Sequence, residues 1–324
     1  MKRTPTLRCF ILLAILMSYQ LCFAETESAS TPEIKTIITA PPESFKLDPF
    51  YKKYVDAWGI PVFSSDKVAD EALLEVKYLI KQVLSARPDI LEGMAKRGVK
   101  IIVIGAKEQV TDIPEYSHMD EYWNRRARGF GGRTTSCGEE NLLNYEGDRY
   151  VGENIFLHEF AHCIHNHLRR AEPGFQDKLN ALYQEATSQG LFENTYAGTN
   201  ASEYWAEGVQ GYLDCNRQSR TGKPDRVHNH VDTREELQAY DPNLFKFIDD
   251  TFRHIEWRYT KYADRQKAKS EKAKKEGRKN TRISRCFYRT AFTPPPLSVL
   301  LTDQRQSYLT CRMDWQKRYT TVSC

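Results

Sequence analysis

The segment "HEFAH", at residues 158–162, has the residue types and the spacing of a metal site. In a helix, residues four positions apart lie on one face, so the imidazoles of His158 and His162 can bind one metal ion. Glu159 lies one position along, where its carboxylate can reach a metal-bound water without being a ligand. In this H-E-x-x-H arrangement, zinc lowers the pKa of its bound water from about 15.7 toward 7, and the glutamate accepts the proton. The segment therefore predicts a zinc site with Glu159 as general base.

The residues around this motif predict that its helix is buried. Three apolar residues precede it, and Phe160 and Ala161 lie within it. Two imidazoles and a carboxylate on a buried helix would cost on the order of several kcal/mol unless each were satisfied. A metal ion would satisfy all three groups, which favours a metal site over a coincidental pattern.

Two further histidines, His165 and His167, follow on the same helix. The metzincin class of zinc enzymes has Gly at the position of His165 and His at the position of Leu168, so this chain does not fit that class. We interpret both histidines as residues of the helix surface, with a supporting role beside a metal ligand as the alternative for His165.

A catalytic zinc has a third protein ligand and one open position. Glu203 and Glu207 are four residues apart in a helical segment, so the spacing allows either one to face the metal. Zinc enzymes with an aspartate ligand would have that aspartate where this chain has Ala201. Cys137 is a further candidate as a thiolate ligand, although a cysteine of an exported protein is more often disulfide-bonded.

Three segments, in this order, resemble the lethal-factor-like family of zinc metallopeptidases, the family of the catalytic domain of anthrax lethal factor. They are "HEFAH" (158–162), "YAGTNASEYWAE" (196–207) and "DPNLFKFIDDTF" (241–252). Within the second segment, the tyrosine, threonine, asparagine and both glutamates fall in the register of the family motif. The resemblance covers residues 158–252, and it does not extend to the other domains, the partners or the substrates of the toxin.

The resemblance implies a role for each candidate residue. It implies three ligands of one zinc ion per chain, His158, His162 and Glu203. It also implies Glu159 as the base. Tyr196 would donate its hydroxyl to the oxyanion that forms during hydrolysis, and Glu207 would orient a ligand histidine.

The helices that would position these residues can be located from hydrophobic periodicity. Apolar residues at helical spacing predict helices at residues 66–86, 152–168, 175–190, 200–215 and 241–259. Asn200 is interpreted as the N-cap of the helix that carries Glu203 rather than as a glycosylated residue. The pair Asp241-Pro242 marks the start of the last of these helices.

A small sheet is predicted beside these helices. The β-branched run "VKIIVIG" (99–105) predicts a buried strand, and the Gly-rich segment that begins at Arg128 predicts an extended edge or loop. We therefore expect an α+β, zincin-like metallopeptidase domain with a small mixed sheet. Its edge, near residues 128–133, would bind an extended peptide by strand addition.

The N-terminus has the pattern of a secretory signal. A basic start is followed by an apolar stretch too short to span a membrane comfortably, and Cys22 and Ala24 are the small residues of a cleavage site. The pattern predicts a signal peptide at residues 1–24, cleavage before Glu25, secretion, and no stable membrane insertion afterwards. An uncleaved signal anchor is the alternative.

The remaining chain is predicted to divide into four parts. These are a polar leader (25–45), the zincin-like domain (46–262), a basic linker or exposed helix (263–285) and a Cys-containing tail (286–324). Residues 261–285 hold eleven basic residues against three acidic ones, within a net charge of +4. Because the positive charge is one segment and not a patterned face, we expect no nucleic-acid partner.

Six cysteines remain after the predicted cleavage: Cys137, Cys163, Cys215, Cys286, Cys311 and Cys324. An even number in an exported chain predicts disulfides, although the sequence does not determine their pairing.

These patterns together predict a secreted zinc-dependent endopeptidase that acts on a peptide or protein. One alternative is a secreted binding protein on a zincin scaffold, against which Glu159 argues because binding alone needs no base. The other is a zinc amidase with a non-protein substrate.

Overall fold

The computed structural model describes residues 37–291, and the side chains of residues 37–278. Among the described residues, chain contacts group those up to Asp264 into one compact unit and those from Arg265 into another. The sheet and the candidate site both belong to the first unit.

The sheet has five strands in the order β1-β2-β3-β5-β4. They are β1 (Lys53–Ala57), β2 (Ile60–Ser64), β3 (Lys100–Ile104), β4 (Gly129–Phe130) and β5 (Thr134–Gly138). The central strands β2, β3 and β5 are parallel, and the edge strands β1 and β4 are antiparallel to their neighbours. The predicted α+β class with a small mixed sheet is therefore confirmed, and the segment near residue 129 does form an edge.

The central strand β3 is buried on both faces. Ile101 and Val103 belong to the main core, which the helices cover, whereas Ile102 and Ile104 belong to a second apolar cluster on the opposite face. A strand covered on both faces has no polar side to alternate with, which explains the continuous apolar run in the sequence.

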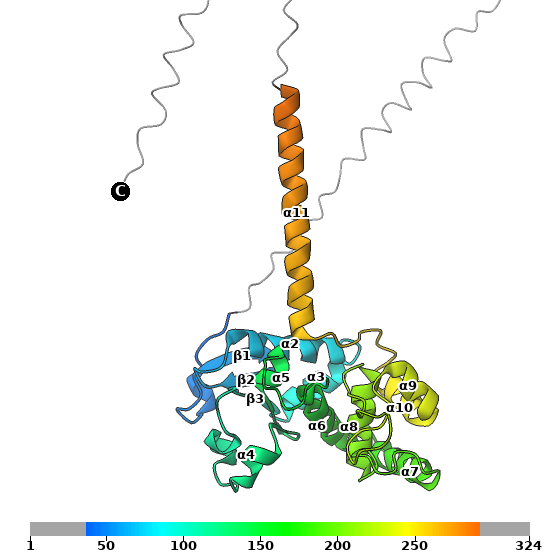
Figure 1. Ribbon diagram of the computed structural model, residues 1–324. Coiled ribbons are helices and arrows are strands. Elements are labelled where there is room, and N and C mark those ends of the chain that lie inside the picture. Colours follow the sequence, from blue (N-terminus) through cyan, green and yellow to red (C-terminus); the bar gives the residue numbers. More distant parts are fainter. Residues whose placement is uncertain (1–36, 292–324) are drawn as a thin grey trace, which may run out of the picture. The chain divides into compact units, whose positions relative to one another are not determined.

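Ten α-helices are described. They are α2 (Asp70–Val83), α3 (Pro88–Lys96), α4 (Tyr122–Arg126), α5 (Glu139–Leu143), α6 (Ile155–Ala171), α7 (Phe175–Ser188), α8 (Ala201–Tyr212), α9 (Arg234–Tyr240), α10 (Pro242–Thr251) and α11 (Tyr262–Ala291). Helix α6 contacts both β5 and α8, and α7, α9 and α10 pack on α8. In Figure 1, α6 and α8 lie side by side. This arrangement places α6 at the centre of the unit, between the sheet and the other helices.

The five predicted helices correspond to α2, α6, α7, α8 and α10, although α10 ends at Thr251, short of the predicted end. Asn200 is the N-cap of α8, and its side chain accepts hydrogen bonds from the backbone N–H groups of Ser202 and Glu203. Asp241 caps α10 in the same way, by accepting from the N–H of Leu244. These caps fix where each helix begins.

The hairpin β1–β2 was not predicted. Its two-residue turn consists of Trp58 and Gly59, which both have positive φ values, 60° and 90°. A turn of this kind matches the twist of the strands that it joins. Pro61, at the second position of β2, is a residue that argues against a strand in a sequence analysis.

The disulfide prediction is wrong for three of the six cysteines. Cys137 of β5, Cys163 of α6 and Cys215 after α8 are free thiols, each buried in the main core. In the core, these three cysteines pack as small apolar residues. The side chain of Cys286, and Cys311 and Cys324 altogether, lie outside the described residues.

The predicted signal peptide, the first part of the predicted leader and the residues from 292 onward also lie outside the described residues. Thr39, within the predicted leader, forms a bridge with Tyr54 of β1. In the part of the chain that the structure describes, no helix combines the length and the apolar character that a membrane span requires.

Candidate metal centre

Helices α6 and α8 bring three donor atoms to one point. The Nε2 atoms of His158 and His162 lie 3.2 Å apart, and each lies 3.2 Å from Oε2 of Glu203. The three atoms thus form an equilateral triangle, and this trio is the candidate metal-binding group among the described residues.

The size of this triangle fits a small tetrahedral ion. Zinc binds imidazole nitrogen and carboxylate oxygen at about 2.0–2.1 Å, and a tetrahedron of that size separates its donors by about 3.3 Å. The observed 3.2 Å edges leave a fourth corner free for a water or a substrate oxygen. The residues present therefore fit a three-ligand catalytic site with one open position.

The charges around the triangle also fit a cation. Burial lowers the pKa of His158, but the hydrogen bond to Glu203 and the nearby carboxylates of Glu159 and Glu207 outweigh burial and raise it to about 10. Burial opposes ionisation of Glu203, yet its bonds to both histidines lower its pKa to about 2. The low pKa of Glu203 keeps a carboxylate at the triangle, and that negative charge would stabilise a divalent cation there.

The packing of α6 on α8 fixes the triangle. Trp205, which is fully buried, donates its indole N–H to the backbone oxygen of Ala161 at 2.9 Å. The N-cap Asn154 begins α6 by accepting from the N–H of Leu157 at 2.9 Å, and its backbone oxygen accepts from the side chain of Gln210 at 3.3 Å. These contacts set the rotation of the two helices. That rotation places Glu203 at the Nε2 atoms of both histidines, and Glu207 at Nδ1 of His158.

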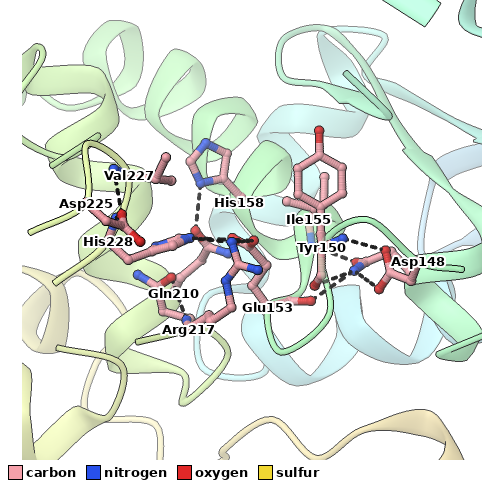
Figure 2. Close-up of polar contacts among 12 residues, drawn as sticks. Asp148, Tyr150, Glu153, Ile155, His158, Gln210, Arg217, Asp225, Val227 and His228 are labelled. Atoms are coloured by element: carbon pink, nitrogen blue, oxygen red, sulfur yellow. Dashed lines mark hydrogen bonds and ion pairs between the residues drawn. The ribbon is translucent and has the colours of Figure 1, made fainter. Parts of the chain in front are cut away.

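Gln210 holds His158 in the form that a metal needs. Nδ1 of His158 lies 2.7 Å from Oε1 of Gln210, which can only accept, so the hydrogen is on Nδ1 (Figure 2). The lone pair of the neutral ring is then on Nε2, which faces the triangle. Gln210 was not predicted from the sequence. Its position seven residues after Glu203 indicates the same face of the helix, and that spacing was the available signal.

Glu207 lies beside the ring of His158, on the side of Nδ1. Its Oε1 is 3.4 Å from Nδ1 of His158, further away than Gln210, and its Oε2 accepts from Asn216 at 3.0 Å. Burial raises the pKa of Glu207, although His158 and His228 oppose that rise. Gln210 rather than Glu207 therefore makes the closest polar contact of His158 Nδ1.

His162 is supported by a chain of polar side chains that includes His165. Nδ1 of His162 lies 3.0 Å from Oγ of Ser202, and that oxygen lies 3.4 Å from Nδ1 of His165, whose Nε2 faces Gln176 at 2.8 Å. The prediction of a surface position was wrong for both later histidines, because His165 packs between α7 and α8 and His167 lies under α3. His165 instead has the alternative role considered for it, because it contacts Ser202, which in turn contacts His162.

The supporting interactions lead to a first prediction. Replacing Gln210 by Leu keeps the volume but removes the acceptor of the His158 N–H, so metal affinity should fall about 10- to 100-fold. Competition with a chelating dye measures this change. Gln184→Leu, on the exposed face of α7, is the control. Equal affinities in the two variants would contradict the orienting role of Gln210.

A cleft of about 670 Å³ opens over the triangle. Its lining includes His158, Glu159, His162, Tyr196, Glu203 and Glu207, together with Gly129, Phe130 and Gly131 of the sheet edge. Glu159 is half-buried in this cleft, and burial raises the pKa of its carboxyl. A carboxylate with a raised pKa beside a metal position is suited to accepting and returning a proton.

Two glycines allow β4 to pass close over α6. A Cβ on Gly131 would lie 2.5 Å from Cβ of His162, and a Cβ on Gly129 would lie 2.8 Å from Cγ2 of Ile155. A larger residue at either position would push the sheet edge away from the cleft. The Gly-rich character of this segment is therefore explained by close approach of the strand to the helix.

Tyr196 lies beside His158 at the wall of the cleft. The two ring centroids are 6.2 Å apart, with the planes 27° from parallel. The backbone N–H of Tyr196 donates to the oxygen of Val227 at 2.8 Å, which ties this segment to the loop after α8. Burial and the neighbouring Glu203 raise the pKa of Tyr196 to about 12, so its hydroxyl stays protonated and can donate a hydrogen bond.

Charged residues behind the triangle contact the loop that follows α8. The Nε2 atom of His228 lies 3.6 Å from Glu153, and its Nδ1 atom lies 3.9 Å from Glu207. Figure 2 shows His228 together with Glu153 and Arg217. Arg217 contacts both His228 and Glu153, at 3.2 and 3.4 Å. The loop that carries Val227 is thereby tied to the residues behind the triangle.

No family model and no curated protein matches this chain. Among solved structures, it is similar to the PRO-PRO endopeptidase PPEP-2 from Paenibacillus alvei, with 18% sequence identity and a TM-score of 0.44. That match covers 60% of this chain and 100% of the other. None of the comparisons places the chain in the lethal-factor-like family, and the interpretation of the site rests on its own residues.

Proposed function

We propose that the protein is a zinc-dependent endopeptidase that hydrolyses bonds within a peptide or protein. The observation that carries the proposal is the donor triangle of His158, His162 and Glu203, which has a free corner and opens into a cleft with Glu159. Two nitrogens and one carboxylate oxygen, with one position open, are the donor set of a catalytic zinc.

Each residue has one task in the reaction. Bound zinc supplies a Lewis acid that makes water nucleophilic near neutral pH. Glu159 accepts the proton of the attacking water and returns it to the leaving amine. Tyr196 donates its hydroxyl to the carbonyl oxygen as that oxygen gains negative charge. Gln210 and Ser202 keep the two ligand rings oriented through their Nδ1 atoms.

The edge strand β4 would hold the substrate. Within residues 37–291, it pairs with β5 on one side and with no strand on the other, so that other side can add an extended peptide strand. The close approach of Gly129 and Gly131 to α6 would bring that peptide next to Glu159.

The family resemblance and the N-terminal pattern extend this proposal. The resemblance over residues 158–252 supports a zincin-like fold and lethal-factor-like ancestry. The apolar N-terminal segment, with cleavage before Glu25, supports secretion. The proposed hydrolytic mechanism requires neither this ancestry nor secretion.

The proposal is tested by digesting a peptide library with the metal-loaded protein and identifying new termini by mass spectrometry. We expect internal cleavage that a chelator abolishes. Release of products only from non-peptide amides would make the protein an amidase. A metal-loaded protein that binds peptides without cutting them would make it a binding protein.

Tyr196→Phe deletes only the hydroxyl and keeps the ring. Because the hydrogen bond to the developing oxyanion forms mainly in the transition state, kcat should fall roughly 10²- to 10³-fold with little change in KM. Metal content and the circular dichroism spectrum should match the wild type. Wild-type turnover in this variant would assign Tyr196 a structural role.

A further inference from the structure

A second pocket, of about 490 Å³, adjoins the cleft at the turn between β4 and β5. Arg97, Arg133 and Arg170 lie at its rim, and we call it the arginine pocket. Val99 and Cys163 contribute apolar surface, and His167 forms part of the wall. The three arginines come from three separate elements: the end of α3, the β4–β5 turn and the last turn of α6.

The positive charge of the arginine pocket is not balanced locally. No acidic residue lines it, and within the described part of the chain none of its three arginines forms an ion pair with a carboxylate. Among the described residues, the guanidinium of Arg170 has one hydrogen bond, which it donates to the backbone oxygen of Asn166. Burial and the charge of Arg97 lower the pKa of His167, so that ring is neutral. Three unpaired guanidinium groups around one pocket attract an anion.

Helix α6 connects this pocket to the candidate metal site. His158, His162, Asn166 and Arg170 follow one another at intervals of four residues, and so form one ridge along the helix. Asn166 lines both the cleft and the arginine pocket. On the facing side, Gly131 lines the cleft, and Gly132, the next residue, lines the pocket. The cleft and the pocket are therefore consecutive stretches of one surface.

The spacing of the residues along this ridge determines how many residues of a bound peptide separate the metal position from the arginine pocket. Asn166 and Arg170 lie about 6 and 12 Å beyond His162 along the helix. An extended peptide covers about 3.3 Å per residue. A peptide that lies beside β4 with its reacting bond at the metal would place a side chain in the arginine pocket about two to four residues away.

We propose that the arginine pocket binds an acidic side chain of the peptide substrate, about two to four residues from the bond that is cut. This inference rests on the proposed function. Guanidinium groups bind carboxylates through paired hydrogen bonds, which gives this position a preference for Asp or Glu over Asn or Gln. A peptide is the favoured source of the carboxylate because the pocket continues the cleft.

The first arm of the test measures binding without catalysis. Fluorescein-labelled hexaglutamate and hexaglutamine are titrated by anisotropy with the wild-type protein, an Arg97→Gln/Arg133→Gln variant and an Arg169→Gln variant. Arg169 is the matched control because it is exposed on the same turn of α6 as Arg170 but does not line the pocket. All three substituted arginines are exposed, so each change spares the core.

We expect hexaglutamate to bind the wild type and the control at least about 10-fold more tightly than the double variant, and hexaglutamine to bind none of them strongly. Equal hexaglutamate binding by the double variant and the control would overturn the proposal. Inorganic phosphate is titrated into the same three proteins by calorimetry, which needs no bound tracer. Binding of phosphate that depends on the two arginines, without binding of hexaglutamate, would also overturn the proposal and assign a small-anion site.

The second arm uses the peptide-library digest. Among cleaved peptides, Asp and Glu should be enriched about two to four residues to one side of the cut, and the double variant should lose this enrichment while Arg169→Gln keeps it. Cleavage without such enrichment would contradict the pocket but leave the peptidase intact. Hexaglutamate binding through the two arginines without any cleavage would contradict the peptidase and leave the anionic-peptide site.

Discussion

Glu203→Ala is expected to empty the metal site and abolish hydrolysis. The carboxylate of Glu203 is the one donor that α8 contributes to the triangle, and it supplies the negative charge that faces both Nε2 atoms. Two imidazoles from one helix remain, which is too few donors for a stable catalytic zinc site. Zinc measured by mass spectrometry should fall from about one equivalent per chain to below about a tenth.

Glu207→Ala is the matched change one turn further along α8. It leaves the triangle complete, and His158 keeps its bond to Gln210 at 2.7 Å. We therefore expect this variant to retain zinc, with a circular dichroism spectrum like that of the wild type. An empty site in Glu207→Ala together with a filled site in Glu203→Ala would reverse the assignment of ligand and supporting residue.

Glu159→Gln is expected to lower kcat about 10²- to 10⁴-fold, the range for loss of a general base. The amide has the shape of the carboxylate but cannot accept a proton from water. Because Glu159 belongs to none of the three donor contacts, the variant should keep its zinc and its fold. Initial rates on a peptide found in the library digest measure the change.

Glu193→Gln makes the same chemical change at an exposed position and should have wild-type activity. Retained zinc in Glu159→Gln separates loss of the base from loss of the metal. Turnover within a few-fold of the wild type in Glu159→Gln would remove the proton-transfer step proposed for this residue.

The part of the site that depends on local spacing could be predicted from the sequence. His158, Glu159 and His162 lie within one turn and a half of α6, so a helical pattern alone places their side chains together. The strand β3 and the caps at Asn200 and Asp241 are local in the same sense. In each case the residues that interact are close in the chain.

The parts that depend on packing between elements could not be predicted. Helical spacing allows either glutamate of α8 to face α6, and the choice of Glu203 follows from the rotation that the Trp205–Ala161 contact sets. His165 and His167 were placed at the surface because the helix pattern does not reveal that α3, α7 and α8 cover them.

The cysteine prediction depended on the compartment inferred from the N-terminus. An exported chain predicts disulfides, but a cysteine is also a small apolar residue that packs well in a core. Cys137 and Cys215 are fully buried, which the sequence pattern around them does not indicate.

The hairpin β1–β2 was not predicted because its turn, Trp58-Gly59, is a weaker hairpin signal than Asn-Gly.

The central claim is that one zinc ion, held by His158, His162 and Glu203, makes this protein a peptidase. The most direct test strips the protein with a chelator and titrates it with zinc while cleavage of a library-derived peptide is followed. We predict no cleavage by the metal-free protein, and activity that rises in proportion to added zinc and levels off at about one equivalent per chain. Cleavage by the fully stripped protein, or no cleavage at one equivalent of bound zinc, would contradict the account.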